Sequence, residues 1–195
     1  MFVRIAALTA AIFITFVSVA SAQQVLTLNR ERVLTESAVG QHIATRIEAI
    51  GAQIDQELAA QRAPIEQEGQ RLNAETQALT SESLQQRPDL MQRIQDLQTQ
   101  GQEFQRAQQK AIRELQATEA QALRPVGEAL QPIIASIAEE RSALVVLNQG
   151  NVVYAANSTD VTAEVINRLN AQLSTVDVTR VRLPEQQAAQ AQQQQ

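Results

Sequence analysis

The stretch that decides the fold begins at residue 43 and reads IATRIEAIGAQIDQEL to residue 58. Its isoleucines and leucine recur at steps of three or four, so one narrow stripe of an α-helix is apolar while the rest of its surface is polar. The stripe continues through Ile65 and Leu72 to Leu79. A helix with so little apolar surface cannot build a globular core around itself, so we predict that it projects into solvent.

A second helix of the same kind follows along the chain. Over residues 94–122 the residues of one face recur at alternating steps of three and four, which is the heptad spacing of a coiled coil, although Gly101 and Gln108 weaken the contact. Pro88 lies between the two helices, removes a backbone donor and disfavours helical geometry in the residue before it. We therefore predict a helical hairpin over residues 41–124, here called the arm. Each half has about 40 residues and a length of about 60 Å.

The first 22 residues are predicted to be a cleavable signal peptide. Arg4 supplies the positive start, residues 5–19 are largely apolar, and residues 20–22 read Ala-Ser-Ala, as a signal peptidase requires. The apolar run of about 15 residues is short for a membrane-spanning helix, which needs about 20. We predict an exported mature chain that begins near Gln23, with a retained membrane anchor as the alternative.

The composition offers little for catalysis. The chain has no cysteine, and its one histidine, His42, is not part of a zinc-binding spacing. A glycine-rich phosphate loop is also missing. We therefore expect no catalytic, cofactor-binding or metal-binding residues and predict that the protein is not an enzyme. The arm carries nine Lys or Arg and twelve Asp or Glu in dispersed order, a net charge of −3, which argues against nucleic acid as a partner.

Three short segments carry β signals. Residues 25–29 read VLTLN and predict a strand. Residues 143–147 and 152–155 are rich in β-branched side chains and flank the loop Asn-Gln-Gly-Asn at residues 148–151. This arrangement predicts a β-hairpin.

The strands at both ends of the mature chain must meet if the arm is inserted between them. We therefore predict a small β body made of residues 23–40 and 125–180, with Pro125 and Pro132 kinking the chain where the arm joins it. A body this small, in two pieces, buries little apolar surface, so oligomerisation is expected to stabilise it. The predicted fold class is α+β, a small β body with a long protruding coiled-coil hairpin.

The end of the chain contains one more helix and a tail. Asp160 is predicted to be the N-cap of an amphipathic helix that follows it. Residues 181–195 are rich in Gln and are predicted to form a disordered tail.

This order of elements resembles the Skp/OmpH family of periplasmic chaperones. The most specific similarity is the segment VVYAANSTDVTAEVI at residues 152–166, which looks like the family's strand, Asp-apolar-Thr step and final helix. Residues 25–37 resemble the family's first strand and the residues after it, and residues 130–133 read LQPI, another family feature. The resemblance covers the mature chain except for the Gln-rich tail.

The resemblance implies a periplasmic homotrimer whose arms surround a cavity that holds unfolded outer-membrane proteins without ATP. The residues expected in the core of the trimer body are Val25, Leu26, Leu28, Leu144, Val145, Val146, Leu147, Val152, Val153 and Tyr154. The residues expected to face a client protein, unless they instead complete the contact between the two arm helices, are Leu84, Leu90, Met91 and Ile112.

One departure from the family limits what the resemblance implies. The best-known members have arms rich in Lys and Arg, whereas this arm is slightly acidic, so contact with a membrane or with lipopolysaccharide has no support here. The alternative function is a periplasmic coiled-coil spacer, or an adaptor hairpin of a secretion or efflux assembly, without chaperone activity.

Overall fold

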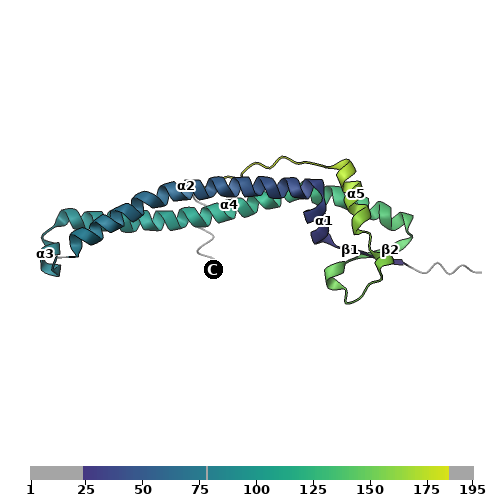
Figure 1. Ribbon diagram of the computed structural model, residues 1–195, viewed down its shortest axis with the longest axis horizontal. Helices are drawn as coiled ribbons and strands as arrows, with labels where there is room; N and C mark the ends of the chain where they lie inside the picture. The colour runs from purple at the N-terminus through teal and green to yellow at the C-terminus, as the bar shows by residue number, and fades with distance from the viewer. Residues whose placement is uncertain (1–23, 78, 185–195) are drawn as a thin grey trace, which may run out of the picture.

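The computed structural model describes residues 24–77 and 79–184; the predicted signal peptide and residues 185–195 of the predicted tail lie outside the described residues. Figure 1 shows two long helices side by side, with a short helix at one end and a small body at the other. This architecture confirms the predicted α+β fold with a protruding helical hairpin. The elements are β1 (Gln24–Leu28), α1 (Arg30–Glu36), α2 (Ala38–Thr76), α3 (Ser81–Gln85), α4 (Pro88–Glu140), β2 (Ala143–Asn148), the 3₁₀ turns η1 (Gln149–Asn151) and η2 (Asn157–Thr159), and α5 (Thr162–Gln172).

The arm is formed by α2 and α4, which pack against each other along the predicted apolar stripes. Helix α2 begins after Ser37, whose side chain accepts a hydrogen bond from the Gly40 amide, and it has 39 residues. Pro88 occupies the first turn of α4, where its missing N–H is not needed, so the turn predicted there is confirmed. The buried residues of the contact between the two helices include Ile43, Ile50, Ile54, Leu72, Ala111, Thr118 and Ala122.

Helix α4 does not end where the arm meets the body. We expected the chain to kink at Pro125 and Pro132, where the arm joins the body, and both prolines lie inside α4, which continues to Glu140. Each proline costs the helix one backbone hydrogen bond. The apolar face that carries Val126 and Ile137 is buried in the body core, and this packing outweighs the loss.

The body sheet differs from the prediction. Strand β1 pairs with β2 in parallel, with Leu26 opposite Val146, and the described residues contain no further strand in this sheet. The predicted hairpin between residues 143–147 and 152–155 is therefore wrong. After β2 the chain enters η1, and residues 152–155 leave the sheet instead of turning back along it. A β-branched run indicates an extended conformation, but it does not specify the strand with which the run pairs.

Helix α1 packs against α2 and α5, and α5 also packs against α4. Asn29 caps α1 by accepting a hydrogen bond from the Arg32 amide. The prediction for α5 needs a correction by one residue, because Val161 occupies the N-cap position and Asp160 precedes it. The Asp160 carboxylate accepts a hydrogen bond of 2.8 Å from the Thr162 amide, so Asp160 still binds the first turn of the helix. The buried core residues shared by these elements include Leu26, Leu28, Val33, Val39, Ile133, Ile137, Val161, Val165 and Leu169.

The segment after α5 differs from the predicted boundary of the tail. Residues 173–184 run in an extended conformation back over the arm (Figure 1), and Val178 is buried there. The predicted tail boundary at residue 181 is therefore too early, since residues 181–183 contact α4. Among the described residues, no helix is long and apolar enough to cross a membrane.

Candidate functional site

The most conspicuous surface of the body is a group of exposed apolar side chains. They lie on β1, on β2 and in the loop after β2, and Val153 and Tyr154 have exposed fractions of 107% and 85%. Exposed apolar patches on proteins mark sites that interact with other proteins, with membranes or with ligands. The large apolar side chains of this surface, here called the body patch, are Val25, Leu144, Val145, Leu147, Val153 and Tyr154.

The residues predicted for the trimer core thus have three different environments. Leu26 and Leu28 are buried within the single chain, and Val146 and Val152 are half-buried. The other six form the body patch. Within β1, Val25 and Leu26 point to opposite sides of the strand, and Leu26 is buried whereas Val25 is exposed.

The arm exposes few large apolar side chains. Of the predicted client-facing residues, Met91 and Ile112 are exposed, with fractions of 39% and 59%, and Leu84 is half-buried. The prediction for Leu90 is wrong, because its side chain is only 1% exposed. Leu90 instead fills the contact at the tip, as the alternative interpretation of these residues allowed.

Ion pairs between the helices also hold the arm. Arg93 of α4 binds Glu68 and Glu75 of α2 at 2.7 and 2.8 Å. The hydrogen bonds to Glu75 and Glu68 raise the pKa of Arg93. At the tip, the hydrogen bond from Arg87 lowers the pKa of Asp89 to about 2. These groups are exposed or half-exposed, so each pair contributes little to stability.

A hollow of about 690 Å³ lies between α2 and α4, on the side covered by residues 173–184. Its apolar lining comes from Ile54, Leu58, Ala107 and Ala111, and the rim carries charges of both signs, such as Glu57 and Lys110. The hollow therefore offers both apolar surface and charged groups of both signs.

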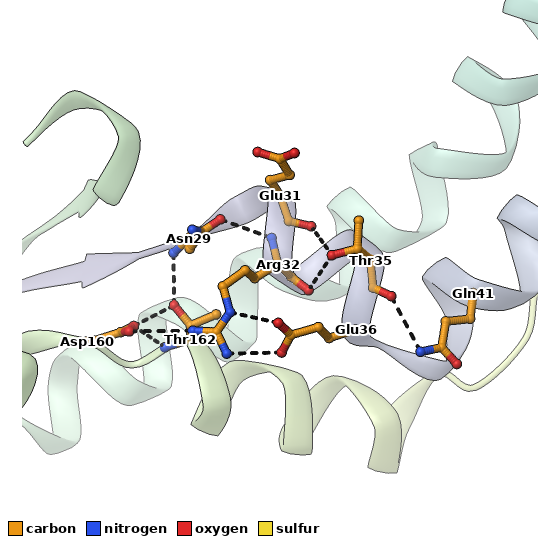
Figure 2. A network of polar contacts seen from close by, with 8 residues as sticks. All are labelled: Asn29, Glu31, Arg32, Thr35, Glu36, Gln41, Asp160 and Thr162. Carbon is orange, nitrogen blue, oxygen red and sulfur yellow. Dashed lines mark hydrogen bonds and ion pairs between the residues drawn. The ribbon is translucent and has the colours of Figure 1, made fainter.

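A network of polar contacts joins the two ends of the body (Figure 2). The amide of Asn29 donates to the Thr162 hydroxyl at 2.9 Å, and the same hydroxyl hydrogen-bonds to Asp160. Arg32 binds Glu36 at 2.7 Å and lies 3.9 Å from Asp160. This network therefore connects the two sequence segments that carry the family resemblance, and it fixes α1 against α5.

A further polar contact ties α5 to α4. The hydrogen bonds from Arg168 and Ser136 lower the pKa of Glu140 to about 2. The two Arg168–Glu140 distances are 2.7 and 2.6 Å.

The single histidine has a structural contact. His42 Nε2 lies 3.0 Å from the carbonyl oxygen of Val176. Within residues 24–77 and 79–184, no three His, Cys, Asp or Glu side chains are placed to hold a metal ion.

Sequence reasoning missed the contribution of residues 173–184 to the arm. Their signal was present: Val176, Val178, Val181 and Leu183 recur at steps of two or three among polar residues, which is typical of an extended segment with one apolar side.

Known proteins resemble this chain in both sequence and structure. The sequence model of one protein family, described as outer membrane protein (OmpH-like), matches residues 24–169. Among solved structures, the crystal structure of a protein described as a putative OmpH-like outer membrane chaperone, from Caulobacter crescentus CB15, is similar to this chain with a TM-score of 0.68 and 26% sequence identity. The similarity covers 84% of this chain and 93% of that chain. A comparison with curated proteins found no match.

Proposed function

The chain belongs to the OmpH-like family of outer membrane proteins, and from this premise we propose that it is a holdase chaperone that binds unfolded outer-membrane proteins in the periplasm without ATP. The observation that carries the proposal is the combination of a long arm, poor in exposed apolar side chains, with a body patch on the same chain. The arm can contact a client weakly at many points, while the body patch can bring several arms together.

The proposed assembly is a homotrimer formed through the body patch. Its six large apolar side chains would lose contact with water on assembly, which is favourable by about 25 cal/mol per Å² of apolar surface. The arms would then extend from a common body and surround a cavity. A ring of three identical chains requires that two different parts of the body patch meet at each contact.

The proposed client contacts are distributed along the arm. Met91 near the tip and Ile112 nearer the body are the exposed apolar side chains predicted for this role, and the hollow between α2 and α4 adds further apolar surface. Weak contacts of this kind leave a client mobile. Single alanine substitutions on the arm would then change client binding little, since each removes about 1 kcal/mol or less.

The experiment follows the aggregation of an unfolded outer-membrane β-barrel diluted from urea, by light scattering. The unmodified protein is expected to suppress aggregation at about one trimer per client without nucleotide. A variant lacking residues 80–95, the tip of the arm, is expected to assemble normally and to suppress aggregation less. The spacer or adaptor alternative predicts no suppression by either protein, and that result would contradict the proposal.

A further inference from the structure

Residues 173–184, here called the clasp, connect the body to both helices of the arm. The clasp leaves α5 at Leu173 and runs along α2 from the body towards the middle of the arm (Figure 1). It begins four residues beyond the part of the chain that the OmpH-like family model matches, which ends at residue 169. Its role therefore does not follow from the family assignment.

One arginine of the clasp binds both arm helices at once. Arg180 Nη1 lies 2.8 Å from Glu57 Oε2 on α2. Its Nε and Nη2 donate to Glu114 Oε2 on α4 at 3.0 and 2.8 Å. A guanidinium group suits this arrangement because its donors diverge in one plane. Arg180 therefore bridges α2 and α4.

The clasp backbone adds contacts on both sides of this bridge. The amides of Val181 and Leu183 donate to Thr118 Oγ1 and Glu114 Oε1, at 2.9 and 3.0 Å. Nearer the body, the carbonyl oxygen of Val176 lies 3.0 Å from His42 Nε2 on α2. The contacts thus extend from the start of α2 to the middle of the arm.

Burial shows that the arm depends on the clasp at this point. Glu114 and Thr118 are each 1% exposed, and the side chain of Arg180 is 13% exposed. A carboxylate withdrawn from water is costly unless its oxygens are hydrogen-bonded and its charge is paired. Both carboxylate oxygens of Glu114 accept hydrogen bonds from the clasp. Glu114 is therefore tolerated in the arm because the clasp covers it.

We infer that the clasp is an intramolecular lock that holds α2 against α4 in the lower half of the arm and fixes the arm to the body. Among the described residues, the hydrogen bonds and ion pairs from the clasp reach no farther along the arm than Glu57 and Glu114. The outer half of the arm therefore depends mainly on the contact between the two helices. Release of the clasp would loosen the lower half of the arm without unfolding the body. The inference does not depend on chaperone activity.

Hydrogen–deuterium exchange of the mature protein tests the lock, with two truncations as a matched pair. One variant ends at Leu173, the C-cap residue of α5, and lacks residues 174–184 of the clasp together with the tail. The other ends at Pro184 and lacks only the tail. Loss of the clasp is expected to speed amide exchange about tenfold in residues 50–58 and 111–118. Exchange in α3 is expected to stay unchanged. The variant that ends at Pro184 is expected to match the full chain.

A point variant checks the result if the shorter truncation disturbs folding. Val178→Asp places a charge where the clasp is 4% exposed, and Thr175→Asp places the same charge at an exposed position of the clasp. Faster exchange in α2 and α4 for Val178→Asp, but not for Thr175→Asp, would support the lock. If Val178→Asp exchanges at the same rate as the full chain, the inference is overturned. It is also overturned if the variant that ends at Pro184 exchanges as fast as the variant that ends at Leu173.

Discussion

Gly40 is the residue at which the fold tolerates no side chain. It lies in the first turn of α2, and a Cβ atom there would be 1.6 Å from the carbonyl oxygen of Leu34 in α1. The close approach of these two helices is what places α1 under the start of the arm. The need for glycine therefore comes from the packing of two backbones, because Gly40 has no positive φ.

We predict that Gly40→Ala destabilises the protein by about 3 kcal/mol, because the backbone of α1 must move to accept the methyl group. Gly51→Ala is the control, since Gly51 is also inside α2 and a Cβ atom there would meet nothing within 4 Å beyond the adjoining backbone of its own helix. That substitution is expected to stabilise the helix by about 0.5–1 kcal/mol. Urea unfolding measures both, and equal effects of the two substitutions would contradict the prediction.

Glu140 gives a prediction for the dependence of stability on pH. Hydrogen bonds from Arg168 and Ser136 lower its pKa in the folded protein from 4.5 to about 2. A lowered folded-state pKa contributes stability above the ordinary pKa, and this contribution is lost as the pH falls towards the folded value. Glu140→Gln should therefore be less stable than the unmodified protein at pH 6, and the difference should vanish towards pH 2.

Thermal unfolding at a series of pH values measures this difference. Glu139→Gln changes the exposed neighbour of Glu140 and serves as the control, with no comparable dependence on pH expected. A constant difference between Glu140→Gln and the unmodified protein from pH 6 to pH 2 would show that the bond to Arg168 does not stabilise the body.

At the scale of single elements, sequence reasoning succeeded where the signal is periodic and local. The steps of three and four predicted both arm helices, and Pro88 predicted the turn between them. The predictions that failed concern which part of the chain a segment packs against. Residues 152–155 have strand propensity without a strand beside them, and the clasp is extended because α2 and α4 offer it a surface. Neither partner can be identified from the segment itself.

The end of α4 gives a prediction at this scale. Ser142, directly after the helix, has a φ of 51°, which is the left-handed region that usually requires glycine. Ser142→Gly removes the steric cost and is expected to stabilise the protein by about 0.5–1 kcal/mol. Ser158→Gly, at an exposed position with ordinary φ, should not stabilise. The comparison requires only urea unfolding curves, and a loss of stability in Ser142→Gly would refute the interpretation.

At the scale of the whole molecule, the body patch could be predicted only in part. The sequence identified its six residues as apolar and β-forming, but it placed them in one core together with Leu26 and Leu28. Only the paired strands show which side chains face the helices and which face outward. Similarly, Leu90 and Met91 are adjacent in sequence, and the packing at the tip decides that one is buried and the other exposed.

The proposed trimer gives a prediction for this patch. Val153 is fully exposed in the single chain, so Val153→Asp should leave the chain folded and abolish assembly, because a charge buried between protomers costs several kcal/mol. Ser158→Asp adds the same charge at an exposed polar position and should assemble normally. Light scattering gives the molar mass and circular dichroism the helical content. A stable monomer for the unmodified protein would refute the trimer.

The parallel pairing of β1 with β2 also determines the order in which the chain can fold. The partner of Val25 is Val145, and the whole arm lies between them in the sequence. A chain that emerges from its N-terminus exposes β1 long before β2 emerges. The arm helices depend on contacts nearer in sequence and can form first, whereas pairing between distant segments is intrinsically slow. Any product that stops before residue 143 would therefore have an arm and an unpaired β1, but no body.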